Sequence, residues 1–414
     1  MNVKKNVTLK KIVLALATTL YLPNISYAVD ACPTGTDAAP TAGCTIGTTG
    51  IDYTLTGDIA PASGIYGIEF TTGADANTLN LTGNISTTGI DAYGLNLSSS
   101  DSNTTTLTGD ISTTGSDAYG LYLSNSGNNI TTLTGNISTI GLYGHGLRLS
   151  YNTIKNTTTV TGGIATTGHE AYGLWLHNSA NATTTVTGDL STTGIAAYGL
   201  YLNTSDSNTT TLTGDITTAG DNVYGIWIRI SDSNSMTING DISVAEGYGV
   251  LIQESDFNNT AITGDITAGG DYATGAYLLD SHSNTLTLGN ISADSTLAGA
   301  GVWLEASDSN EIIINGRVSG SGEAVAISVQ NTSDSNTITL NQGGSIIGNI
   351  VNDSTNNTLN FNLGRAASYN FTTSGSVDWI LNDTTKTVIA GSAKSRGVAD
   401  MDDAGNRLYQ RLSQ

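Results

Sequence analysis

Carboxylates are the most abundant groups in this chain that could carry out chemistry. The sequence has 35 Asp and Glu residues against 14 Lys and Arg residues. Sugar-cleaving enzymes need two carboxylates, or a carboxylate and a basic residue, gathered at one place. Here the acids recur at equivalent positions of a repeat, as duplication alone would produce. The one adjacent pair, Asp402 and Asp403, fits the solvated side of a C-terminal helix, so no catalytic carboxylate pair is predicted.

The histidines and serines also lack the spacing of a reactive site. His145, His169, His177 and His282 are spread over the repeats without the spacing of metal ligands. Neither of the serine-nucleophile motifs Gly-x-Ser-x-Gly and Gly-Asp-Ser-Gly occurs, and the calcium-binding repeat Gly-Gly-x-Gly-x-Asp is also missing. We therefore expect a protein that is not an enzyme and that needs no metal or cofactor.

Aromatic side chains form the first candidate binding surface. They belong to a row of residues that stand between two aliphatic residues and are expected to point outward: Asn96, Tyr122, Arg148, Trp175, Tyr201, Trp227, Leu251, Tyr277 and Trp303. Stacked aromatic faces could bind sugar rings or a partner protein. Aromatic stacking across strands could equally serve to stabilise a sheet. The candidate ligand contacts are Tyr122, Trp175, Tyr201, Trp227, Tyr277 and Trp303.

Threonines form the second candidate surface. They occur as Thr-x-Thr pairs: Thr54/Thr56, Thr106/Thr108, Thr132/Thr134, Thr159/Thr161, Thr185/Thr187 and Thr211/Thr213. Regular threonine rows resemble those of ice-binding β-solenoids, although Thr is also an ordinary outward strand residue. The row is interrupted at Asn80, Asn239, Ala261 and Ile312.

A repeat positions both rows. Its Thr-Gly-Asp-Ile core recurs at spacings of 24 to 27 residues, with the glycine at 57, 83, 109, 135, 162, 188, 214, 240, 264, 289 and 316. A second mark, usually Tyr-Gly, follows in most copies. A period of this length means one supersecondary unit stacked on itself.

Strict alternation around the repeat glycine predicts strands with one buried face. In one copy Leu107 and Ile111 flank Gly109 at two residues on either side, and polar residues stand between them. Ser-Asp-Ser-Asn runs fit tight polar corners. An Asn recurs six residues before the glycine, as at Asn103, and stacked coils would align these amides in a ladder. We predict an all-β parallel β-helix of about 12–13 coils, whose regular repeats occupy residues 51–340.

The N-terminal region predicts export. Residues 1–28 have four lysines, an apolar run and a small-residue end, which fits a signal peptide cleaved after Ala28. Residues 29–50 are expected to cap the first coil, with Cys32 and Cys44 joined in a disulfide. Without residues 1–28 the chain has 10 basic against 35 acidic residues, a net charge near −25. Such a charge excludes nucleic acid and anionic membranes as partners.

The C-terminal region changes character twice. Residues 341–394 keep an alternating pattern with bulkier side chains and are expected to cap the stack. Residues 395–414 place Val398, Met401, Leu408 and Leu412 on one stripe, which predicts a short amphipathic helix.

The whole arrangement resembles the passenger domain of a bacterial autotransporter, the type V secretion family. The resemblance rests on the exported Thr-Gly-Asp-Ile/Tyr-Gly-Leu coils, the segment Val377-Asp378-Trp379-Ile380-Leu381 and the helix from Arg396 onward. It implies a right-handed β-helix, a terminal segment that aids folding outside the cell, and an outer-membrane β-barrel translocator.

No barrel strands follow Gln414, so we expect a truncated relative, or a translocator encoded separately. The resemblance implies an adhesion or host-contact protein whose partner is a host-cell surface protein or glycan. The alternatives are a polysaccharide-degrading β-helix enzyme and an ice-binding solenoid. The expected location is the cell surface, outer membrane or extracellular space, or the periplasm if no barrel exists.

Overall fold

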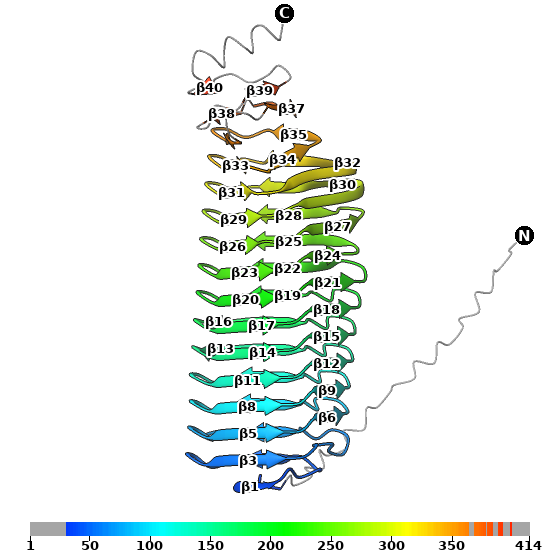
Figure 1. Cartoon of the computed structure of the whole chain (residues 1–414), viewed down its shortest axis with the longest axis vertical. Helices are drawn as coiled ribbons and strands as arrows, with labels where there is room; N and C mark the ends of the chain where they lie inside the picture. Colours follow the sequence, from blue (N-terminus) through cyan, green and yellow to red (C-terminus); the bar gives the residue numbers. More distant parts are fainter. Residues whose placement is uncertain (1–29, 364–367, 378, 384–387, 392–397, 400–414) are drawn as a thin grey trace, which may run out of the picture.

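The protein forms an elongated stack of parallel β-coils, as seen in a computed structural model of the chain (Figure 1). The structure describes residues 30–363, 368–377, 379–383, 388–391 and 398–399. Within these residues it is an all-β solenoid of about 13 turns with a repeat of about 26 residues, and it contains no helix. The predicted fold class is confirmed.

Each regular coil has three short strands separated by three corners. In one coil these strands are β8 (Thr104–Thr108), β9 (Ile111–Thr114) and β10 (Leu121–Ser124). Successive coils place equivalent strands side by side, which gives the solenoid three faces. We call them the threonine face, the small-residue face and the aromatic face, in chain order. The first, second and third corners follow them in the same order.

The threonine face is a single sheet of 16 parallel strands. Its other members are β1 (Gly35–Ala38), β3 (Asp52–Thr56), β5 (Thr78–Thr82), β11 (Ile130–Thr134), β14 (Thr157–Thr161), β17 (Thr183–Thr187), β20 (Thr209–Thr213), β23 (Ser235–Asn239), β26 (Asn259–Ile262), β29 (Thr285–Leu288), β31 (Glu311–Ile314), β33 (Thr337–Asn341), β36 (Thr358–Asn362), β38 (Ile380–Asp383) and β40 (Val398–Ala399).

The other two faces share one sheet of 24 strands. The small-residue face has β6 (Ile85–Thr88), β9, β12 (Ile137–Ile140), β15 (Ile164–Thr167), β18 (Leu190–Thr193), β21 (Ile216–Ala219), β24 (Ile242–Val244), β27 (Ile266–Gly270) and β34 (Ser345–Ile347). The aromatic face has β2 (Cys44–Ile46), β4 (Ile68–Phe70), β7 (Leu95–Ser98), β10, β13 (Leu147–Ile154), β16 (Leu174–Ala180), β19 (Leu200–Asn203), β22 (Val223–Arg229), β25 (Gly247–Gln253), β28 (Thr274–Leu279), β35 (Asn349–Asn352), β37 (Ser368–Ser374) and β39 (Val388–Gly391). Two long strands, β30 (Ile291–Glu305) and β32 (Arg317–Gln330), run along both faces.

The core is a set of aliphatic files that run along the solenoid axis. Alternation sends every second strand residue inward, so Leu107, Ile111 and Leu121 are at most 2% exposed. A constant repeat length brings the same residue type to the same place in the next coil; Leu107, for example, pairs with Leu133. The core is therefore continuous from coil to coil.

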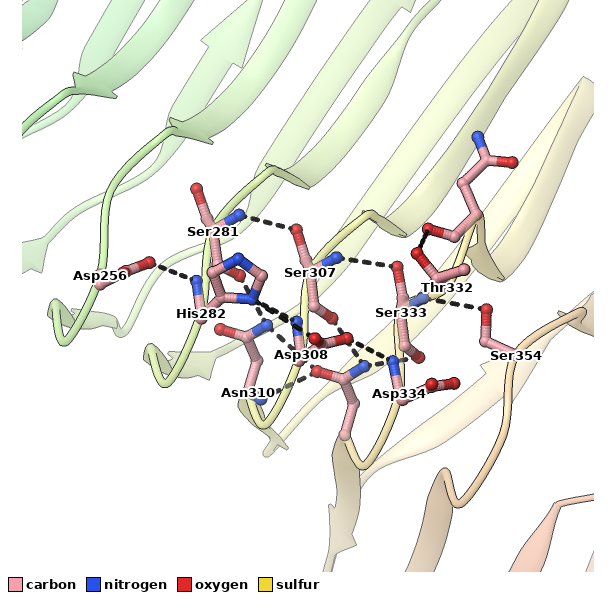
Figure 2. Close-up of polar contacts among 12 residues, drawn as sticks. Asp256, Ser281, His282, Ser307, Asp308, Asn310, Thr332, Ser333, Asp334 and Ser354 are labelled. Carbon is pink, nitrogen blue, oxygen red and sulfur yellow. Dashed lines mark hydrogen bonds and ion pairs between the residues drawn. The ribbon is translucent and has the colours of Figure 1, made fainter.

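The third corner is held by the predicted asparagine ladder. The backbone N–H of Asn103 donates to Oδ1 of Asn129 at 2.8 Å, and the same bond repeats in most coils. The amide oxygens thus accept from the main chain of the neighbouring coil, which satisfies donors buried in the corner. A parallel ladder of serine hydroxyls joins it, and Figure 2 shows both around Ser281, Ser307 and Asn310.

The two chain ends add partial coils. Cys32 and Cys44 form a disulfide with their Cα atoms 4.8 Å apart, and β1 and β2 extend two of the faces below the first full coil. The predicted signal peptide lies outside the described residues. So does most of the predicted C-terminal helix, but Val398 and Ala399 within it form β40 and pair with β38 instead. No helix among the described residues is long and apolar enough to cross a membrane.

Candidate binding face

The structure brings the aromatic row into one file. Each member is the middle residue of a strand on the aromatic face, so its neighbours point into the core and it points away from it. Residue pairing runs from Asn96 to Tyr122, Arg148 and Trp175, and on to Trp303. All six candidate ligand contacts therefore lie on one face of the solenoid.

A second aromatic file, which was not predicted from the sequence, lies beside the first. It consists of the residue before the second repeat glycine: Tyr66, Tyr93, Tyr119, His145, Tyr172, Tyr198, Tyr224 and Tyr248. Adjacent rings stack with centroids 4.7 to 5.1 Å apart. The recurring Tyr-Gly pair is the sequence signal for this file, although in the sequence it marks only the repeat.

The two files pack edge to face. The side chains of the first file are therefore less exposed than the sequence predicts. Trp175 lies edge-on to Tyr172 with centroids 5.4 Å apart, and Trp227 lies edge-on to Tyr198 at 5.1 Å. Edge-to-face pairs add stability beyond the area that they bury. Tyr201 is only 5% exposed and belongs to a small cluster with Tyr172 and Tyr198. The remaining five candidates are half-buried, so the row points outward but is partly covered by its own neighbours.

Arg148 is built into the aromatic file. It is 8% exposed, and its guanidinium carbon lies 4.1 Å from the centroid of a Trp175 ring and 4.9 Å from that of Tyr119. The guanidinium also donates to the Tyr119 hydroxyl. Among the described residues it forms no ion pair with a carboxylate. The ring faces therefore supply much of the attraction that offsets the lost hydration of its charge.

Acidification is expected to destabilise the wild-type chain more than a His145→Tyr variant. Burial, and then the charge of Arg148, hold the pKa of His145 well below its usual value. The unfolded chain takes up a proton at about pH 6.5 that the folded chain does not. The free energy of unfolding is therefore unaffected by His145 above this pH, and it decreases as the pH falls below it.

Tyr occupies the same position in most neighbouring coils, so His145→Tyr keeps the stack and removes the titrating group. Thermal unfolding of both proteins at about pH 7.5 and about pH 5 tests the expectation. The loss of Tm on acidification should be smaller in the variant. An equal loss in both proteins would show that His145 does not drive the pH dependence.

The strands of the threonine face are in register. Successive strands pair without a shift, so that Thr106, Thr132 and Thr159 fall in one file and Thr108, Thr134 and Thr161 in another. These side chains are half-buried or exposed. Ile312 was placed in this row wrongly: it is fully buried, and Ile313 takes the outward position.

Several of the described aspartates have a structural role in the corners. Asp110 accepts the backbone N–H of Asn136 at 2.7 Å, and Asp256 accepts that of His282 at 2.6 Å in the third corner (Figure 2). These aspartates recur in the sequence because each accepts a backbone N–H of the neighbouring coil. Within the described residues no group of three or more His, Cys, Asp or Glu side chains is arranged to hold a metal ion.

Comparison with known proteins supports the fold and little else. No protein-family model and no curated protein matches the chain. Among solved structures, the chain resembles Vag8, an autotransporter passenger, in the structure of the Vag8–C1 inhibitor complex. The TM-score is 0.56 at 17% identity, over 89% of this chain and 98% of the matched chain.

A second likeness is to the A-module of the mannuronan C-5 epimerase AlgE4 of Azotobacter vinelandii. The TM-score is 0.40 at 12% identity, over 91% of this chain and 98% of the other, which is too slight to carry an argument. At the identity of the first likeness, the comparison shows the fold alone. The chain has a parallel β-helix like that of an autotransporter passenger.

Proposed function

We propose that this chain is an exported, non-enzymatic passenger that adheres to a host-cell surface protein or glycan through its aromatic face. The observation that carries the proposal is the double file of aromatic rings along one side of the solenoid. Half-exposed Trp and Tyr side chains provide large, rigid contact area at little entropic cost. The files fix them in place, so that a partner meets a preorganised surface.

The charge of the chain supports the choice of face. The acidic groups lie mainly in the corners, where like charges repel anionic ligands and exposed ion pairs contribute little. The middle of the aromatic face bears instead Arg148 among the rings, with Trp175 and Trp227 beyond it. A partner that docks there buries apolar ring surface, which is the main source of contact energy.

A polysaccharide-degrading enzyme is the less supported alternative. Such an enzyme needs carboxylates gathered at one place on the stack. The described carboxylates with defined partners are instead used as corner acceptors, as with Asp110 and Asp256, or bound to a tyrosine, as Glu305 is to Tyr277. The solenoid therefore supports a contact surface better than a reaction site.

The proposal includes the export route inferred from the sequence. Residues 1–28 act as a signal peptide cleaved after Ala28, and the Cys32–Cys44 disulfide suits an oxidising compartment. Residues 29–50 and 341–394 cap the stack of residues 51–340, and residues 395–414 lead toward a β-barrel translocator. The passenger is then displayed at the cell surface or released.

Binding by the purified mature chain tests the proposed function. We expect saturable binding to host cells, or to members of arrays of immobilised glycans and extracellular proteins. It should fall at least about tenfold when Trp175, Trp227 and Trp303 are replaced by leucine. Leucine suits this file because Leu251 occupies it, 4% exposed. Unchanged binding by a folded variant would exclude the aromatic face.

The register of the threonine face favours ice binding as a second candidate. Its threonine files repeat at the spacing of adjacent strands, about 4.8 Å, without a shift over several coils. Thermal hysteresis by the mature chain would support this candidate.

A further inference from the structure

One coil of the solenoid is shorter than its neighbours at the second corner. Between the paired positions Thr218 and Tyr224 the chain has five residues, but between Val244 and Tyr248 in the next coil it has three. The coil after that returns to five, between Ala268 and Thr274. Two missing residues in one coil, with full-length corners on both sides, leave a notch.

The notch is an open pocket of about 190 Å³. The long corners on either side supply Asn222, Asp271 and Tyr272, and the short corner supplies Glu246 and Gly247. Tyr224 and Tyr248 complete the lining. Gly247 has φ of 147°, and a Cβ there would lie 2.0 Å from the carbonyl oxygen of Val223, so the short corner depends on this glycine. The volume suits one side chain of a partner.

The stacked tyrosine file ends in this notch. Tyr248 stacks on Tyr224 with centroids 5.0 Å apart, but the next position along the file is Thr274. The file therefore ends on a tyrosine ring that has no parallel-stacked ring in the following coil. From that coil only Tyr277, of the outward row, contacts it, edge to face with centroids 5.4 Å apart. Tyr272, 57% exposed, stands at the same pocket. Electron-rich ring faces attract cations.

Two carboxylates make the same pocket negative. Within the described part of the chain, the exposed Glu246 carboxylate has no hydrogen-bond or ion-pair partner. Asp271 uses one oxygen to accept from the hydroxyl of Thr296. No basic side chain lines the notch, and the mature chain is strongly acidic overall. Such a site disfavours sialylated, sulfated or uronic sugars through like-charge repulsion.

We propose that this notch binds the cationic side chain of a lysine or arginine on the surface of a partner protein. The cation would lie against the Tyr248 and Tyr272 rings and pair with Glu246 and Asp271. Rings and carboxylates together hold an ammonium or guanidinium group better than either does alone. The inference rests on the proposed function, because it identifies the partner of the aromatic face as a protein rather than a glycan.

Small probes test the notch directly in the full mature chain. Nα-acetyl-lysine methylamide and Nα-acetyl-arginine methylamide are titrated while the tyrosine ring signals are followed by NMR after ring labelling. We expect saturable shifts that include Tyr248 and that weaken with added salt. The uncharged Nα-acetyl-norleucine methylamide and methyl glucoside should cause none. Equal shifts with norleucine or the sugar, or no shift with either cation, would overturn the proposal.

Variants locate the binding. Replacing Glu246 with Gln and Asp271 with Asn should weaken cation binding by about three- to tenfold. Removing one charge outside the notch, with Asp241→Asn in the first corner of the short coil, should leave cation binding unchanged. The corner is kept because Asn still accepts the Asp265 N–H. Tyr248→Leu should weaken binding as well. Equal affinity in the double variant and wild type would contradict the assignment.

The outcomes also separate this inference from the proposed function. Probe binding that maps to the notch, in a chain that adheres to no host surface, would retain the cation site and reject adhesion. Adhesion that survives Glu246→Gln with Asp271→Asn but is lost in the Trp175, Trp227 and Trp303 variant would retain the aromatic face and reject the notch.

Discussion

Replacing Gly109 with alanine is expected to destabilise the solenoid by about 3 kcal/mol or more. Gly109 has φ of 146°, which side-chain-bearing residues rarely adopt. A Cβ at this position would lie 2.1 Å from the carbonyl oxygen of Gly83 in the preceding coil. The clash is with backbone, so neither coil can move aside without breaking the ladder between them. Denaturant unfolding of the mature chain measures the effect.

Gly163→Ala is the matched control. Gly163 lies at the first corner two coils further on, and its nearest non-adjacent atom to an added Cβ is 3.2 Å away. Its φ is not in the left-handed region. We expect a change below about 1 kcal/mol. Similar losses in both variants would show that the corners adapt, and that the repeat glycine is not required by close stacking.

Replacing Asn310 with leucine is expected to cost about 3 kcal/mol by removing one step of the buried ladder. Oδ1 of Asn310 accepts the backbone N–H of Asn284 at 2.8 Å. Its amide nitrogen donates to the carbonyl of Ser281 at 2.9 Å, as Figure 2 shows. Leucine has nearly the same size, so the change isolates the two buried groups left without partners. The free energy of unfolding reports the loss.

The control is Asn259→Leu at an exposed position, which should change the free energy of unfolding by less than about 0.5 kcal/mol.

The converse change, Ala182→Asn, adds a step to the ladder. Ala182 interrupts the ladder between Asn156 and Asn208, although its own N–H still donates to Asn208. An asparagine there should add about 1 kcal/mol. If Asn310→Leu were harmless and Ala182→Asn neutral, the ladder would not stabilise the coils.

The fold could be predicted because each copy of the repeat has the same alternation of apolar and polar residues. Alternation around Gly109 identifies the inward residues Leu107 and Ile111, and a nearly constant spacing stacks them on the next coil. The asparagine ladder could be read from Asn103 and its equivalents for the same reason. The error at Ile312 arose where Ile312, Ile313 and Ile314 form an apolar run without alternation.

The candidate face was predictable only in part. Strand alternation correctly sent Trp175 and Trp227 away from the core. It could not show that the Tyr residues before the second repeat glycine turn toward them, because that contact depends on how the second corner bends. The burial of Tyr201 and Arg148 follows from this contact. The notch at Glu246 needed the paired register of three coils.

Binding by two matched variants of the mature chain tests the central claim most directly. One variant carries Trp175→Leu, Trp227→Leu and Trp303→Leu on the aromatic face. The other carries Thr185→Ala, Thr187→Ala, Thr211→Ala and Thr213→Ala on the threonine face, where Ala261 already occupies one file. We expect both to fold, the first to lose at least about tenfold in host binding and the second to bind as wild type. The reverse result would contradict the account and assign the contact to the threonine face.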